Sequence, residues 1–163
     1  MNVHLAHGSV LILSLMLLVM LTLMAVTQVS FNSIQTHIAT NSADLNVAFQ
    51  TAEGALNEAT NQLVAGTIAT TGFLSNTNGL YLANATNPPL FSSIDWTNPN
   101  AVIFGFQGGS STQAAYLIEQ LPSVVRPGQN MMTAAQVFRI TARAVGASGQ
   151  SPVMLQSTEQ LQQ

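Results

Sequence analysis

The sequence predicts an α+β fold in which one long N-terminal helix packs on a C-terminal antiparallel β-sheet. A continuous apolar segment, residues 10–26, leads without proline into an amphipathic pattern that continues to about residue 65. A segment rich in Asn, Thr, Ser, Gly and Pro follows over residues 66–100. Short runs of alternating apolar and polar residues then recur up to residue 158, as strands of a half-buried sheet do.

The apolar segment has the length of a membrane anchor. Residues 9–31 supply the ~20 predominantly apolar residues that a transmembrane helix needs. A secretory signal peptide has a shorter apolar region, a basic start and a small-x-small cleavage site. The first eight residues, MNVHLAHG, contain no Lys or Arg, and no clear site of that kind follows. The sequence therefore favours an anchor over a discarded signal peptide.

The helix is expected to continue beyond the membrane as an amphipathic half. Apolar residues recur mostly at intervals of three and four, with one interval of seven and two adjacent pairs, which indicates a single helical stripe. The expected stripe consists of Phe31, Ile34, Ile38, Leu45, Ala48, Phe49, Ala52, Ala55, Leu56, Ala59 and Leu63. The expected polar face carries Asp44, Gln50, Glu53, Asn57 and Glu58. Gly66 is the expected stop, so a helix over residues 9–65 would be about 85 Å long.

The remainder of the chain predicts a loop region followed by strands. Prolines at positions 88, 89 and 99 disfavour regular structure in residues 66–100. Strands are expected over residues 101–107, 115–121, 136–145 and 152–158, with prolines ending the second strand and a Gly146–Gly149 hairpin joining the last two. In the third strand one face is apolar, with Phe138, Ile140, Ala142 and Ala144, and the other carries Arg139, Thr141 and Arg143. The amphipathic half-helix is the natural cover for the apolar face.

The composition excludes several classes of function. Charged residues make up only 6% of the chain, and cysteine and lysine are absent, which suits a subunit packed into something larger. A nucleic-acid partner is not expected without a basic patch. His4, His7 and His37 are not clustered as zinc ligands are, and no histidine follows to build a Ser–His–Asp triad. We expect no catalytic, cofactor or metal site, and no enzyme activity.

Three stretches resemble a known family. GSVLILSLMLLVMLTLMAV, residues 8–26, resembles a prepilin cleavage site and hydrophobic segment. AFQTAEGALNEA, residues 48–59, resembles the A-F-Q-A-A-E-x-A-L signature of PilX-type minor pilins of type IV pili. AAYLIEQLP and VFRITARAVGASGQSPVMLQSTEQ, residues 114–122 and 137–160, resemble that family's Y-x-I-E and R-I-T-A-R-x-x-G…V-x-L-Q-S-T patterns. The resemblance covers both ends of the chain, lapses across residues 66–112, and implies a type IV pilin-like fold.

The resemblance also implies a processing site and a topology. Prepilin peptidase would cut between Gly8 and Ser9, and the new amine of Ser9 would be methylated. The implied segments are a leader (1–8), a membrane or filament-core half-helix (9–31), an amphipathic half-helix (32–65), and a periplasmic or extracellular region (66–163). The subunit would span the inner membrane once before assembly, with its C-terminal region in the periplasm, and lie in the surface pilus afterwards.

The chain departs from the usual pilin pattern at two places. Most pilins carry Glu at the fifth mature position, where this chain has Leu13, so it cannot offer that carboxylate to a neighbour's terminal amine. PilX-like minor pilins and tip pseudopilins often lack it too, which fits a tip or initiation role, although Leu13 also reads as an ordinary lipid-facing residue. The leader has no Lys or Arg, so the positive-inside bias does not orient it.

The expected function is that of a minor pilin that primes pilus assembly at or near the tip and supports twitching and adhesion. Its partners would be other minor pilins, the major pilin, prepilin peptidase, the inner membrane and a tip adhesin. Glu53, Arg139 and Arg143 are candidate subunit contacts, with a solvated surface as the alternative for each. Two alternatives remain open: a minor pseudopilin of a type II secretion system, and a single-pass anchor of a periplasmic binding module that is not cut at Gly8.

Overall fold

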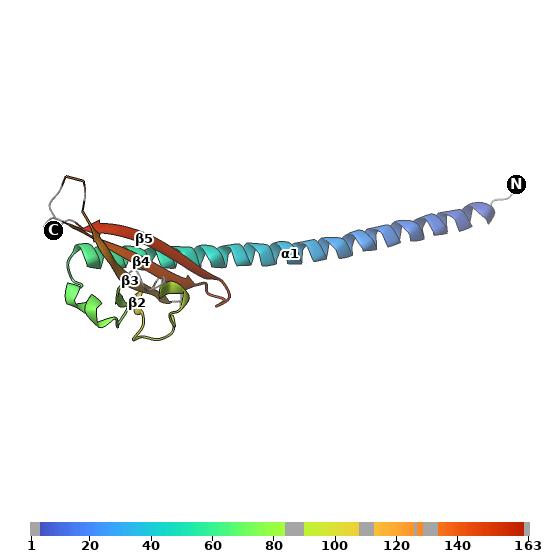
Figure 1. Ribbon diagram of the computed structural model, residues 1–163. Helices are drawn as coiled ribbons and strands as arrows, with labels where there is room; N and C mark the ends of the chain where they lie inside the picture. Colours follow the sequence, from blue (N-terminus) through green and yellow to red (C-terminus); the bar gives the residue numbers. More distant parts are fainter. Residues whose placement is uncertain (1–3, 84–89, 108–112, 126, 129–133, 162–163) are drawn as a thin grey trace. The chain divides into compact units, whose positions relative to one another are not determined.

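The computed structural model describes residues 4–83, 90–107, 113–125, 127–128 and 134–161. In chain order the elements are α1 (His4–Val64), η1 (Thr70–Ser75), β1 (Leu80–Leu82), η2 (Leu90–Ser92), β2 (Ile103–Gln107), β3 (Gln113–Val124), β4 (Ala135–Val145) and β5 (Pro152–Leu161) (Figure 1). The chain divides into two compact units, Met1–Ser42 and Ala43–Gln163. The first contains the N-terminal part of α1, and the second contains the rest of α1 with the sheet.

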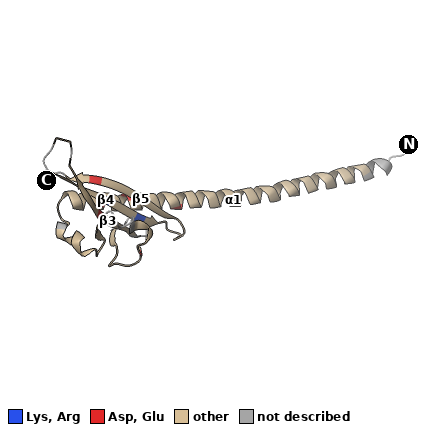
Figure 2. Cartoon of the chain, viewed as in Figure 1, with Lys and Arg blue, Asp and Glu red and all other residues tan. Residues whose placement is uncertain are grey.

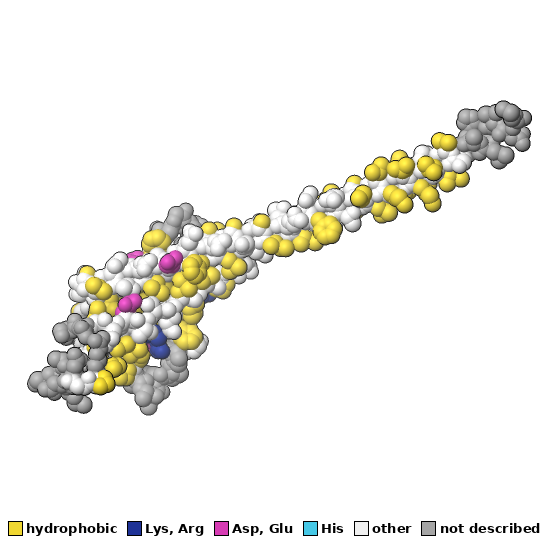
Figure 3. Space-filling view, turned by 90° about the horizontal axis from the view of Figure 1, so that it is seen from above, with side chains coloured by type: hydrophobic (Ala, Val, Ile, Leu, Met, Phe, Trp, Pro, Cys, Tyr) yellow, Lys and Arg dark blue, Asp and Glu magenta, His cyan; other side chains and the backbone are white. Residues whose placement is uncertain are grey.

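The N-terminal part of α1 exposes its apolar side chains all around the helix. Its large apolar residues from Val10 to Phe31 are between 46% and 69% exposed (Figure 3). The hydroxyls of Ser14, Thr22 and Thr27 donate back to helix carbonyls at 2.9, 2.8 and 2.7 Å, so these polar residues need no partner outside the helix. Within the described residues, α1 from Ser9 is the one helix long and apolar enough to cross a membrane.

In the second unit α1 packs on one face of the sheet through a row of small residues. Ala48, Ala52, Ala55 and Ala59 are completely buried, which lets the helix backbone approach the strands closely. The largest fully buried side chains of this core come from the sheet and η1, and they are Phe73, Tyr116, Ile118, Phe138 and Ile140. The predicted apolar face of the 136–145 strand, including Ala142 and Ala144, is confirmed, as is the α+β arrangement.

The buried stripe of α1 differs from the predicted one. Leu45 and Phe49 were expected in the stripe but are each 47% exposed, whereas Asp44 and Thr51 were not expected there and are 9% and 3% exposed. The alanine row fits against the sheet most closely, and this turns the helix so that Asp44 faces the unit and Phe49 faces away. The apolar periodicity located the helix correctly. However, it centred the buried face on the side of the helix that carries the larger side chains, whereas the observed centre is the alanine row.

The end of α1 follows the expected signal. Gly66 has a positive φ of 69°, and its N–H donates to Leu63 O at 3.2 Å. Thr67 N–H donates to Gln62 O at 3.1 Å. These two bonds form the Schellman arrangement with glycine at C′, which satisfies carbonyls that the last helical turn leaves open. Gly66 therefore stops α1, as predicted.

The sheet has five strands and is mixed. Its order is β1-β3-β4-β5, and β2 also pairs with β3. The pairings β2–β3, β3–β4 and β4–β5 are antiparallel, as expected, but β1 pairs with β3 in parallel. The expectation of a loop over residues 66–100 was incomplete, because β1, η1 and η2 lie within it. Tyr81 anchors β1: it is 9% exposed, and its hydroxyl donates to Ala101 O at 2.8 Å.

Two further sequence expectations need correction. Pro122 was expected to end the second strand, but β3 continues to Val124, with an irregular register between Leu121 and Val124 that accommodates the proline. The sheet face opposite α1 was expected to be polar and solvated, but Leu117, Glu119 and Thr141 on that face are no more than 1% exposed. The sheet is therefore largely buried on both faces along β3 and the middle of β4.

Candidate assembly surfaces

The residues predicted for processing lie in the first unit. Gly8 and Ser9 lie within the first turns of α1, and Ser9 is exposed. Leu13 is 63% exposed on the same helix, among other exposed apolar side chains. Cleavage between Gly8 and Ser9 and methylation of Ser9 remain predictions.

The three predicted contact residues lie on two surfaces of the second unit, with Glu53 on α1 and both arginines on one face of β4. Glu53 is exposed on α1. Arg139 forms an ion pair with Glu119, its cross-strand partner, with Nε 2.6 Å from a carboxylate oxygen. The Arg139 side chain is only 21% exposed, so its first partner lies within its own subunit. Arg143 is half-buried on β4, four residues along the same strand.

Asp44 connects α1 to the hairpin between β4 and β5. Its carboxylate accepts hydrogen bonds from the Ser148 N–H at 3.0 Å and the Ser148 hydroxyl at 2.6 Å. The Ser148 hydroxyl, and then its backbone N–H, hold the pKa of the Asp44 carboxyl below its usual value. Gly146 lies against the same carboxylate, and a side chain at that position would overlap it. The charged form of Asp44 thus fastens the hairpin to the helix.

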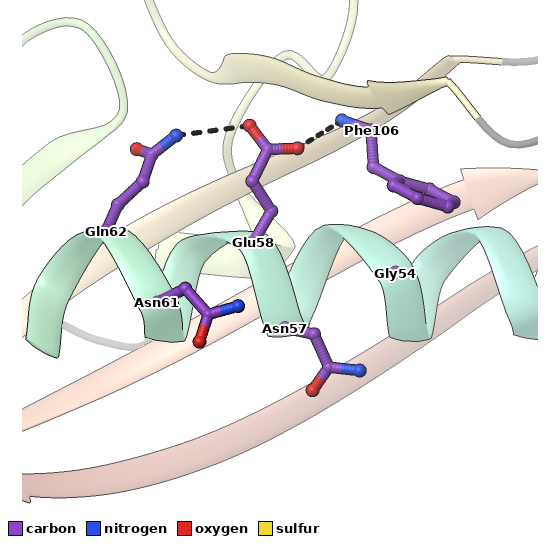
Figure 4. A pocket seen from close by; sticks show the side chains of 6 residues that line it. All are labelled: Gly54, Asn57, Glu58, Asn61, Gln62 and Phe106. Atoms are coloured by element: carbon purple, nitrogen blue, oxygen red, sulfur yellow. Dashed lines mark hydrogen bonds between the residues drawn. The ribbon is translucent and has the colours of Figure 1, made fainter. Parts of the chain in front are cut away.

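A second polar network joins α1 to β2 and β3 (Figure 4). Glu58 accepts the Phe106 N–H at 2.6 Å and the Gln62 side-chain amide at 3.1 Å. The Tyr116 hydroxyl donates to the Gln62 side-chain oxygen at 3.1 Å. Burial, reinforced by the negative charge of Glu58, raises the pKa of Tyr116 to about 12. This network ties β2, which pairs only with β3 among the described strands, to the helix.

An open hollow of about 440 Å³ lies over this network. Its lining residues are Gly54, Asn57, Glu58, Asn61, Gln62 and Phe106, and Figure 4 shows Glu58 and Gln62 pointing toward β2. The Phe106 ring occupies the space over Gly54 that a side chain there would need. The lining offers amides, one carboxylate and an aromatic ring, but no nucleophile with a base. Among the described residues, no group of three His, Asp or Glu could hold a metal.

The second unit also exposes apolar side chains and carries few charges. Leu45 and Phe49 are four residues apart on α1, so they lie on one side of the helix. On β2, Phe104 and Phe106 are 38% and 41% exposed. Figure 2 shows how sparse the charged residues are along the described chain. A surface of this kind suits contact with another protein better than isolated exposure to water.

The roles of Asp44 and Glu58 were not predicted from the sequence. Asp44 lies four residues before Ala48, in line with the alanine row, so its position on the buried face could have been read from the spacing. A carboxylate placed there requires hydrogen-bond donors, and the Gly146–Gly149 turn is rich in them. No sequence signal indicated that Glu58 would bind the N–H of a residue 48 positions away.

Comparison with known families agrees with these observations. The family model described as type IV pilus assembly protein PilX C-term matches residues 57–160, and the PilX N-terminal model matches residues 7–57. No curated protein and no solved structure matches the chain. Membership of this family implies that the chain is a minor pilin of a type IV pilus, that is, a structural component that associates with other pilus components. With both of its family models matched and a pilin-like helix and sheet, the chain belongs to the PilX family of type IV pilus assembly proteins.

Proposed function

We propose that this minor pilin primes type IV pilus assembly and lies at or near the pilus tip, acting by subunit association without catalysis. The observation that carries the proposal is the exposed apolar part of α1 between Val10 and Phe31, which needs lipid before assembly and other apolar helices after it. Leu13 at the fifth mature position supports a tip location, because a subunit without that carboxylate cannot accept the terminal amine of a neighbour.

The segments of the chain divide this role among them. Residues 1–8 are the leader that prepilin peptidase removes on the cytoplasmic side, and Ser9 becomes the methylated N-terminus. Residues 9–31 span the inner membrane and later lie in the filament core. Residues 32–65 carry the amphipathic half of α1. Residues 66–163 lie in the periplasm and then at the surface of the pilus, where they contact other minor pilins, the major pilin and a tip adhesin.

Processing is tested by the mass of the N-terminal peptide in native membranes, with and without prepilin peptidase. Loss of eight residues and one added methyl group on Ser9, only when the peptidase is present, is expected. Gly8→Val should block cleavage, because it places a branched side chain at the residue directly before the cleaved bond. Leu11→Val is the matched control within the apolar segment. A full-length N-terminus in both strains would contradict the proposal and favour a simple membrane anchor.

Priming is tested separately by deleting the gene. Surface pili, and with them twitching and adhesion, should fall strongly, and blocking retraction should restore a small number of pili. Normal piliation in the deletion strain would refute the priming role. Loss of a secreted protein with normal pili would instead assign the chain to a type II secretion system.

A further inference from the structure

The free edge of the sheet lies along β5. Among the described residues, β5 pairs only with β4, through ten consecutive residue pairs from Val145↔Pro152 to Gln136↔Leu161 without a register shift. The opposite edge of β3 is covered by β1 and β2, and both β2 and β3 carry register shifts. One side of the sheet is therefore closed and irregular, whereas the other ends in a long and regular strand.

The hairpin fixes which backbone groups of β5 face outward. Gly146 N–H donates to Ser151 O at 3.2 Å, so this residue pair is of the hydrogen-bonded kind. In an antiparallel ladder such pairs alternate with pairs that do not exchange hydrogen bonds. Val145 and Pro152 form the next pair, which agrees with the missing N–H of proline. The N–H and C=O groups of Met154, Gln156 and Thr158 therefore point away from β4, toward the free edge.

The middle of this edge, residues 153–158, lacks several features by which proteins usually prevent strand pairing, and Pro152 and Glu159 flank it within β5. Such features are charged side chains, prolines inside the strand, bulges and a covering loop. Between Val153 and Thr158 the strand contains no charged residue and no proline, and its pairing with β4 has no bulge. The side chains of Met154, Gln156 and Thr158 are exposed on the face away from α1. An edge kept this regular is suited to accept a further strand.

We propose that β5 is the docking edge for an extended strand of a different minor pilin, which joins its sheet to this one through backbone hydrogen bonds. The inference rests on the proposed function, because it assumes that subunits enter the same membrane in the same orientation. It specifies which surface of the globular unit makes the contact.

The same topology argues against a second copy of this chain as the occupant. Antiparallel pairing of β5 with another β5 would reverse one α1 relative to the other. Parallel pairing of the two would place the helices on opposite faces of the joined sheet. A copy could offer only its opposite edge, but there β1 and β2 are short and run in opposite directions along β3. A different pilin with a longer regular strand meets the requirement.

The test uses a proline that removes an outward N–H without breaking the β4–β5 ladder. Thr158→Pro takes one donor from the free edge, whereas Thr158→Ala changes the side chain and keeps the backbone. Ser157→Pro removes an N–H that points to β4 and serves as the control for loss of folding. Each full-length variant is expressed in the native host in place of the wild type, and other minor pilins that co-purify in detergent are quantified.

We expect Thr158→Ala to recover partner pilins within about twofold of the wild type, and Thr158→Pro to recover at least tenfold less while keeping the wild-type urea midpoint. Hydrogen exchange provides the second measurement: the amides of Met154, Gln156 and Thr158 should exchange at least tenfold more slowly in the complex than in the isolated chain. If Thr158→Pro lowers the urea midpoint, the exchange measurement decides.

Three outcomes would overturn the inference in distinguishable ways. Full recovery of partners by Thr158→Pro, or unchanged exchange of the three amides in the complex, would show that β5 is not the docking edge and would leave the minor-pilin proposal intact. Protection of the same amides in a complex that contains only this chain would replace the different pilin with a second copy. Failure of the wild type to recover any minor pilin would overturn both proposals.

Discussion

Replacing Phe138 tests whether the packing of α1 on the sheet holds the globular unit together. The Phe138 ring is 1% exposed, and its centroid lies 5.5 Å from that of Phe73 at an interplanar angle of 45°. A buried Phe→Ala change costs about 3–5 kcal/mol, because apolar contact is lost and a cavity remains. Loss of the aromatic pair, worth about 0.5–1.5 kcal/mol, places the expected cost of Phe138→Ala near 4 kcal/mol. A domain is stable by only about 5–15 kcal/mol, so this is a large fraction.

Urea unfolding of the full chain in detergent, followed by tryptophan fluorescence, measures this cost. The single tryptophan, Trp96, lies in the globular unit, where its indole N–H donates to Phe91 O at 3.3 Å. With an m-value of about 2 kcal/mol/M, Phe138→Ala should lower the urea midpoint by about 2 M. Phe49→Ala is the matched control, because Phe49 is 47% exposed and its loss should change stability by less than about 0.5 kcal/mol. Similar midpoint shifts for the two variants would refute the assignment of the buried face of α1.

Three further predictions follow from the polar groups. Asp44 has a lowered pKa in the folded state, so its contribution to folding stability is present above the usual carboxyl pKa and is lost as the pH falls through the folded pKa. Asp44→Asn should lower the urea midpoint at pH 7 and make the midpoint decline less steeply toward pH 3. An unchanged pH profile would count against the contact with Ser148. Tyr116 has a raised pKa of about 12, so its contribution to folding stability is complete below pH 10 and is lost as the pH rises toward 12. Absorbance at 295 nm should show the ionisation of Tyr116 only near pH 12. Titration of both tyrosines near pH 10 in the native state would contradict the burial of Tyr116. Arg139→Met should lower the free energy of unfolding in urea by about 3 kcal/mol, because Glu119 stays buried without that cation. The double variant Glu119→Leu with Arg139→Met should recover most of this loss. If the double variant is as unstable as the single one, the ion pair does not explain the cost.

The sequence predicted the elements that have strong periodicity. The helix, its stop at Gly66, and the last two strands with their hairpin follow from local patterns and capping chemistry. β1 escaped prediction because a three-residue strand has almost no periodicity, and only its parallel pairing with β3 and the buried ring of Tyr81 define it. β3 continued past Pro122 because an irregular register tolerates a missing N–H, which a local rule against proline does not foresee.

The candidate site was less accessible to sequence reasoning. Gly8, Ser9 and Leu13 were identified through family resemblance, since an exposed helix start carries no distinguishing geometry. The exposure of Phe49 could not be predicted, because periodicity gives the spacing of a stripe but not which of its residues the sheet contacts. The free edge of β5 depends on strand order, which is a property of the whole sheet that single-strand patterns do not contain.

The contact between Asp44 and Ser148 has a consequence for the order in which the protein matures. The two residues are 104 positions apart, so their hydrogen bonds cannot form until nearly all of the globular unit has been synthesised. Closing so large a loop is costly in chain entropy, so we expect the β3–β4 and β4–β5 ladders to form before the hairpin contacts the helix. In the proposed topology, that hairpin is also among the last segments to cross the membrane. In that topology the contact between Asp44 and Ser148 forms only after most of the subunit has been exported, and a chain truncated before residue 148 would keep its N-terminal apolar helix but lack this contact.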